Sequence, residues 1–313
     1  MLRSYPEAQE PWSEATWIDL CDASESERAA VERATGLRVP DQSAVREIET
    51  TSRVYTENNA LYLSTPLPAS PNASEPLSAV GFVLTSRVLI SVRFTENTVF
   101  NNLFQGCQTA PAQSASEVFL RILEALVDRA ADTLEHCSAQ LDDLSHRAFH
   151  AERPRRRALK TVSEKLRATL RTLGQIGDHI SQIRDTLLGF GRIAAFVCET
   201  GNPVVTAEER PRLLAARADI SSLNDYQQHL SGKVQFLLDA TLGFISIEQN
   251  DVVKALTIVS VVGVPPVLVG GIYGMNFEHM PELHWLFGYP FALLLMLITG
   301  LLPLVWFKWR GWM

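Results

Sequence analysis

Two apolar runs near the end of the chain, 252-VVKALTIVSVVGVPPVLVGGIY-273 and 286-LFGYPFALLLMLITGLLPLVWF-307, decide its fold. Lys254 is the only charged residue in the first run, and the second run has none. At 1.5 Å per residue, about 22 helical residues span roughly 33 Å, enough for a hydrocarbon core of about 30 Å. We therefore predict two transmembrane helices, over residues 252–273 and 286–307.

The charges that flank these runs predict how the chain is inserted. Lys254 stands at the start of the first span, and Lys308 and Arg310 lie in the tail 308–313. The connection 274–285 has no lysine or arginine and carries Glu278 and Glu282. Because positive residues stay on the cytoplasmic side, we expect both termini to be cytoplasmic and the connection to be external. The expected location is the plasma (inner) membrane, with membrane lipids as neighbours.

The bulk properties exclude several other classes of protein. The chain has 313 residues and a formal net charge of −7, which argues against a nucleic-acid partner. Its four cysteines are scattered, so neither a disulfide framework nor a zinc ribbon is expected. The first ten residues contain no apolar segment typical of a signal peptide. There is no phosphate-binding glycine loop, so no nucleotide is expected, and no motif of an enzyme.

Residues 1–114 predict an α+β cytoplasmic domain, a small mixed sheet with helices. A helix is expected from Ser24, with acidic residues in its first turn, to near Gly36. Residues 65–76 contain four prolines and are predicted to form a loop. The expected strands are short and rich in Val, Ile, Leu and Tyr, and cover residues 16–20, 46–51, 60–64, 80–85 and 88–94.

Long helices follow. Apolar residues recur every three or four positions within 115–206, which predicts paired helices separated by a break at Pro154. A stalk helix over 207–251 keeps the same spacing and meets no helix breaker before the first span. We therefore predict one unbroken helix from about residue 207 to residue 273, roughly 100 Å long.

The residues that join the two spans resemble a known family. Gly274, Met275 and Asn276 follow Tyr273, and the sequence Met-Pro-Glu-Leu occupies positions 280–283. This arrangement, between two C-terminal spans, is similar to the signature of the CorA family of divalent metal-ion transporters. The resemblance implies a funnel-shaped homopentamer whose five first spans line a pore, with the Gly-Met-Asn loops at its external mouth. It also implies potential-driven influx of Mg²⁺, and of Co²⁺ or Ni²⁺, closed by intracellular Mg²⁺.

One face of the first span is the expected pore lining. Its residues step by three and four along the helix: Asn250, Val253, Leu256, Ser260, Val264 and Val267. By resemblance, Asn250 forms an inner polar ring, and Val253 and Leu256 form an apolar constriction. Narrow apolar rings can gate by dewetting. Asn250 could instead form hydrogen bonds between helices, and Gly270 and Gly271 permit close helix approach.

The external loop is the expected selectivity site. Mg²⁺ gives up its water reluctantly, so neutral oxygens from Asn276 and from carbonyls near Gly274 suit a hydrated ion. Asn276 could also serve simply as a helix cap. Glu278 and Glu282 would concentrate cations at the mouth, unless they are only solvated loop residues. Asp239 matches a family position near the inner entrance and is a candidate metal contact, the alternative being a solvated carboxylate.

Two departures from the family pattern leave alternatives open. Val267 stands where the family usually has a threonine, and residues 153–157 form a basic cluster where relatives tend to be acidic. With His279 and His284 in the loop, a zinc transporter of the related ZntB branch, possibly proton-coupled, is the first alternative. A membrane-anchored sensor without transport is the second. No cofactor is expected beyond the transported and regulatory Mg²⁺.

Overall fold

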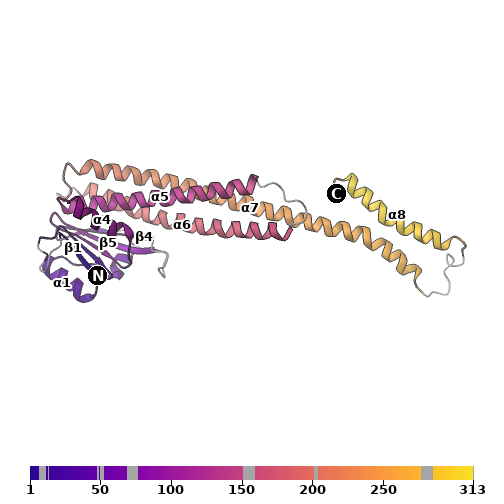
Figure 1. Cartoon of the computed structure of the whole chain (residues 1–313), viewed down its shortest axis with the longest axis horizontal. Helices are drawn as coiled ribbons and strands as arrows, with labels where there is room; N and C mark the ends of the chain where they lie inside the picture. The colour runs from indigo at the N-terminus through magenta and orange to yellow at the C-terminus, as the bar shows by residue number, and fades with distance from the viewer. Residues whose placement is uncertain are drawn as a thin grey trace. The chain divides into compact units, whose positions relative to one another are not determined.

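The structure is a computed structural model that describes residues 1–6, 12, 14–47, 49, 53–68, 77–150, 159–200, 204–275 and 285–312, apart from the side chains of residues 150 and 159–163. The chain forms two compact units (Figure 1). The first comprises residues 1–158 and 167–238, and the second comprises residues 159–166 and 239–313.

A six-stranded mixed sheet is the centre of the first unit, as expected for an α+β domain. Its order is β1-β2-β6-β5-β4-β3, in which only β2 and β6 run parallel. The strands are β1 (Leu2–Tyr5), β2 (Trp17–Cys21), β3 (Val54–Glu57), β4 (Ala60–Pro68), β5 (Leu77–Leu84) and β6 (Leu89–Arg93). The predictions for β2, β4, β5 and β6 are confirmed to within a few residues at their starts.

Alternation along the strands divides the hydrophobic core between the two sheet faces. Leu61 and Leu63 of β4 belong to the larger cluster, which continues into the long helices. Tyr62 lies in a second cluster on the opposite face, together with Val31 of helix α1. The two sheet faces are therefore both covered.

A buried ion pair joins strands β2 and β6 of the sheet. Arg93 donates to both carboxylate oxygens of Asp19, at 3.1 and 2.8 Å, and Ser91 donates to the same carboxylate at 2.8 Å. Burial opposes the charge on Arg93, but its hydrogen bond to Asp19 raises the guanidinium pKa above its ordinary value. Both charges are thus paired inside the unit, as buried charges must be.

Short helices connect the strands. The prediction for α1 (Glu25–Thr35) is confirmed: Ser24 and Glu27 form a reciprocal capping box, and Gly36 ends the helix with φ +71°. The strand predicted over 46–51 is wrong in its described part, because Arg46 ends helix α2 (Gln42–Arg46) and residues 47 and 49 belong to no strand; residues 48, 50 and 51 lie outside the described part. Asp41 accepts from the backbone N–H of Ala44 and caps this helix. Helix α4 (Thr98–Thr109) was not predicted.

Strand β4 also corrects the predicted loop over 65–76, because residues 65–68 continue the strand to Pro68. They pair with β5, from Thr65 opposite Val80 to Pro68 opposite Leu77. On its other side, β4 pairs with β3 only over 60–63 among the described residues. The prolines therefore lie where the strand has a neighbour on one side, a position that tolerates a missing N–H. Residues 69–76 lie outside the described part.

Three long helices lie side by side along the first unit (Figure 1). They are α5 (Ala115–His150), α6 (Leu159–Glu199) and the first part of α7 (Arg210–Tyr273). Their apolar positions form one continuous buried core. The prediction of one unbroken helix into the first span is confirmed, since α7 has 64 residues. The break predicted at Pro154 lies outside the described residues.

The second unit contains the apolar part of α7 and helix α8 (Gly288–Trp309). Both helices are long and apolar enough to cross a membrane. At most 11% of the most apolar stretch of either helix is buried, so neither helix is the covered core of a soluble protein. The two predicted spans are therefore both helical, over nearly the predicted residues.

Candidate ion pathway

The predicted pore-lining residues occupy one exposed face of α7. Val253, Leu256 and Val267 have exposed fractions of 59%, 68% and 73% in the single chain. Asn250, Ser260 and Val264 are exposed as well. At about 100° per residue, the spacing of all six places them on one broad side of the helix. A mainly apolar surface of this size that no other described part of the chain covers is suited to contact with further copies or with lipid.

The opposite side of α7 packs against α8. A side chain added at Gly270 would lie 3.3 Å from Cε of Met296, and one added at Gly300 would lie 3.4 Å from Cγ of Pro266. Small residues thus let the two helices approach closely. Gly270 fulfils its predicted role, whereas Gly300 was not anticipated because a single sequence does not reveal which residue faces it. The packing leaves the predicted pore face directed away from α8.

The hydroxyls near this face are bonded to their own helix. Ser260 donates to the carbonyl of Leu256 at 3.0 Å, and Thr257 donates to that of Val253 at 2.8 Å. Each hydroxyl oxygen keeps lone pairs that can accept from a water molecule. A ring of Ser260 side chains would therefore present acceptors to a hydrated ion.

Helix α7 ends at the predicted external mouth. The N–H of Gly274 donates to the carbonyl of Gly270 at 3.0 Å, and that of Met275 donates to Ile272 at 3.2 Å. A Cβ at Gly274 would lie 3.1 Å from the Gly270 oxygen, so the turn favours glycine. Gly274 and Met275 are both exposed. Asn276, Glu278 and Glu282 lie outside the described residues, and their roles stay predictions.

Asp239, the candidate inner metal contact, is exposed on α7. Among the residues that the structure describes, no group of three or more His, Cys, Asp or Glu side chains is placed to hold a metal ion. One chain therefore supplies no complete site of this kind in its described part. Any regulatory site that uses Asp239 would need ligands from elsewhere, such as a second copy.

Salt bridges attach the N-terminal half of α7 to α5. Arg212 donates to both carboxylate oxygens of Glu124, at 3.0 and 2.7 Å, and these hydrogen bonds raise the pKa of its guanidinium. Further toward the C-terminus of α7, Lys233 donates to Asp142 of α5 at 2.6 Å. None of these four residues was singled out in the sequence, because only the packing of α7 on α5 brings them together.

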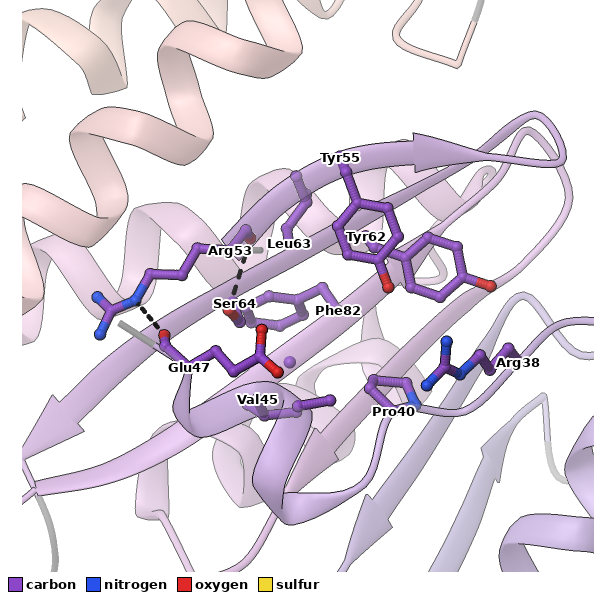
Figure 2. A pocket seen from close by; sticks show the side chains of 12 residues that line it. Arg38, Pro40, Val45, Glu47, Arg53, Tyr55, Tyr62, Leu63, Ser64 and Phe82 are labelled. Carbon is purple, nitrogen blue, oxygen red and sulfur yellow. Dashed lines mark hydrogen bonds between the residues drawn. The ribbon is translucent and has the colours of Figure 1, made fainter. Parts of the chain in front are cut away.

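A hollow in the first unit has the wrong chemistry for a cation. It has a volume of about 300 Å³ and lies between α2 and strands β3, β4 and β5 (Figure 2). Its charged side chains are Arg38, Arg53 and Glu47, and the rings of Tyr55 and Tyr62 stack at 4.8 Å on one wall. Two guanidiniums against one carboxylate would repel a divalent cation, so the α7 face remains the candidate pathway.

Comparison with known proteins identifies the family. Residues 12–309 match the family described as CorA-like Mg²⁺ transporter protein. This chain belongs to the CorA family. It is thereby a divalent-cation transporter of the membrane, with transmembrane helices.

Individual CorA relatives match along nearly the whole chain. The magnesium transport protein CorA of Escherichia coli K12 is 30% identical over 319 residues, covering 100% of this chain and 96% of that protein. The complete CorA structure from Methanocaldococcus jannaschii matches with a TM-score of 0.78 at 17% identity, covering 100% and 98% of the two chains. The ZntB cytoplasmic domain from Vibrio parahaemolyticus matches with a TM-score of 0.56 at 14% identity, covering 74% and 87%. These two structures show a shared fold.

Proposed function

We propose that this chain assembles as a homopentamer in which five copies of the α7 face surround an ion pathway. The observation that carries the proposal is the exposed face from Asn250 to Val267, directed away from α8. In such an assembly α8 forms the outer ring toward the lipid. Both termini lie in the cytoplasm and the Gly274–Asn276 loop opens outside, as the flanking charges favour.

The proposed cargo is Mg²⁺, the ion named for the E. coli relative. Five Asn276 amides would accept hydrogen bonds from the water shell of the ion without stripping it. Glu278 and Glu282 would raise the local cation concentration and so speed capture. Binding of this kind is weak enough for release, which conduction requires. Co²⁺ and Ni²⁺, also divalent and hydrated, would be admitted as well.

Membrane potential supplies the driving force in this proposal. An inside-negative potential contributes about 2.3 kcal/mol per charge per 100 mV, hence about 4.6 kcal/mol for a divalent ion. Influx then needs no catalytic group. The apolar rings of Val253 and Leu256 would close the pathway by dewetting. Intracellular Mg²⁺ would favour closure by bridging carboxylates of neighbouring subunits, Asp239 among them, whose mutual repulsion otherwise loosens the ring.

A zinc transporter of the ZntB branch is the second candidate. Two features favour it: the loop histidines His279 and His284, and Val267 in place of a polar ring. Imidazole is a good zinc ligand, whereas hydrated Mg²⁺ prefers oxygen. A sensor without transport would have no use for an exposed stripe that includes Asn250 and Ser260.

Uptake by purified protein in liposomes tests the proposal. We expect a Mg²⁺-sensitive dye to report uptake under an inside-negative potential, and Asn276→Ala to abolish it. Asn224→Ala is the matched control, because within the described part of the chain the Asn224 side chain donates to its own helix, at the Ile220 carbonyl. If Zn²⁺ enters under a proton gradient while Mg²⁺ does not enter, the second candidate is favoured. If neither ion enters although the protein is folded and pentameric, the proposed ion pathway is wrong.

A further inference from the structure

An apolar groove runs along one side of α8. It has a volume of about 470 Å³ and is almost wholly apolar. Its lining residues are Ile298, Leu301, Leu302, Val305, Trp306 and Trp309. Their spacing places them on the side of α8 opposite Met296 and Gly300, which face α7. The groove is therefore directed away from α7 of the same chain.

The C-terminal turn of α8 is held in a fixed shape. The N–H of Trp312 donates to the carbonyl of Phe307 at 3.0 Å, and that of Gly311 donates to Lys308 at 3.2 Å. Gly311 has φ +73°, so this is a Schellman motif. The Trp312 ring stacks on Phe307 with 5.4 Å between centroids, the apolar contact that accompanies such a turn. The tail is thus ordered up to Trp312.

This turn positions a cation at the end of the groove. The guanidinium of Arg310 lies over the ring of Trp306, 5.2 Å from its centroid, and Trp306 itself lines the groove. Cation–π contact restricts the side chain without using its N–H donors. Those donors form the planar fork that binds a phosphate with two hydrogen bonds. A long basic side chain at a helix end also reaches naturally to the headgroup level.

We propose that the groove and Arg310 together form a binding site for an anionic glycerophospholipid. One acyl chain lies along Leu301, Leu302 and Val305, and the phosphate is held by Arg310. The charge of the neighbourhood selects the lipid: residues 286–313 include Lys308 and Arg310 but no Asp or Glu. A lipid with a net negative headgroup is therefore favoured over a zwitterionic lipid of the same chain length.

Native mass spectrometry of the full chain in detergent tests this site. Phosphatidylglycerol and phosphatidylcholine with identical acyl chains are added in equal amounts, and bound lipid is counted. We expect phosphatidylglycerol to be retained preferentially, and Arg310→Gln to reduce that retention about fivefold. Trp306→Leu should act in the same direction, because it removes the ring that positions Arg310. Lys254→Gln, which removes a charge at the other span, should leave retention unchanged.

Three results would overturn the site. The first is equal retention of the two lipids by the unmodified protein, and the second is an equal loss of phosphatidylglycerol in the Arg310 and Lys254 variants. The third is displacement of bound phosphatidylglycerol by glycerol 3-phosphate as effectively as by phosphatidylglycerol itself. The last would mean that free phosphate is recognised without the groove. The same spectra report the assembly state, so a misfolded variant is recognised and Trp306→Leu then provides the comparison. Because lipid and not ion is measured, the outcome is independent of the transport experiment.

Discussion

At the scale of a single residue, Glu209 connects the first turns of two helices. Its carboxylate accepts from the backbone N–H of Thr206 at 2.9 Å, and Thr206 accepts in return from the N–H of Glu209, a capping box for α7. The hydroxyls of Ser114 and Ser116, at the start of α5, donate to its other oxygen at 2.9 and 3.0 Å. One side chain thus caps α7 and joins it to α5.

Acid should weaken this connection. Burial opposes ionisation of Glu209, but hydrogen bonds from Thr206, Ser116 and Ser114 prevail and lower its pKa in the folded protein. A lowered carboxyl pKa stabilises the fold above the unfolded value, about 4.3, and that stabilisation is lost as pH falls through the folded value. We expect Glu209→Gln to lower the thermal midpoint at pH 7, and we expect this deficit to shrink progressively as the pH falls below about 4.3. Glu208→Gln, at an exposed neighbouring residue, should change neither the thermal midpoint at pH 7 nor its dependence on pH. A Glu209→Gln deficit that stays constant as the pH falls would contradict the proposed role of Glu209.

At the scale of an element, α6 contacts β4 so closely that glycine is needed. A Cβ at Gly189 would lie 1.9 Å from Oγ1 and 2.8 Å from Cβ of Thr65, whereas nothing lies within 4 Å of one at Gly174 on the same helix. We expect Gly189→Ala to destabilise the first unit by about 1–3 kcal/mol through overpacking. Gly174→Ala should be neutral or stabilising by up to about 1 kcal/mol, since alanine is the better helix former. Thermal unfolding of both variants in detergent measures the difference; equal effects would mean that α6 and β4 are not in contact.

At the scale of the whole molecule, the two sides of α7 should differ in their access to water. Ser260 lies on the proposed pathway face, and Val262 lies on the side that packs on α8 near Gly300. In a cysteine-free background, a cationic thiol reagent should block Mg²⁺ uptake through Ser260→Cys, because it adds positive charge to the pathway. It should leave Val262→Cys unaffected.

The assembly itself provides the control for that experiment. Light scattering of the detergent-solubilised protein should give five times the 34.8 kDa chain mass after the detergent contribution is removed. Block of both cysteine variants, or of neither, in a protein of that mass would argue against the proposed face. A different mass would argue against the pentamer.

The sequence by itself determined the features that depend on neighbouring residues. The two spans follow from hydropathy, the continuity of α7 follows from an unbroken apolar spacing, and the ends of α1 follow from Ser24, Glu27 and Gly36. The exposed face that we propose to line the pathway is equally local, because a helix of known period assigns Asn250, Val253 and their successors to one side. The Gly274–Asn276 signature also indicated the family before any comparison.

Only the tertiary structure decided the features that depend on residues far apart in the chain. Pro66 and Pro68 read locally as loop, yet pairing with β5 holds them in a strand. Arg46 reads as strand, but its segment forms α2, whose Val45 packs within reach of Gly81 on the sheet. Likewise, no local pattern shows that Gly300 meets Pro266, and it is that contact which directs the proposed pathway face away from α8. Local propensity is a weak preference, and the burial and hydrogen bonds gained in long-range pairing outweigh it.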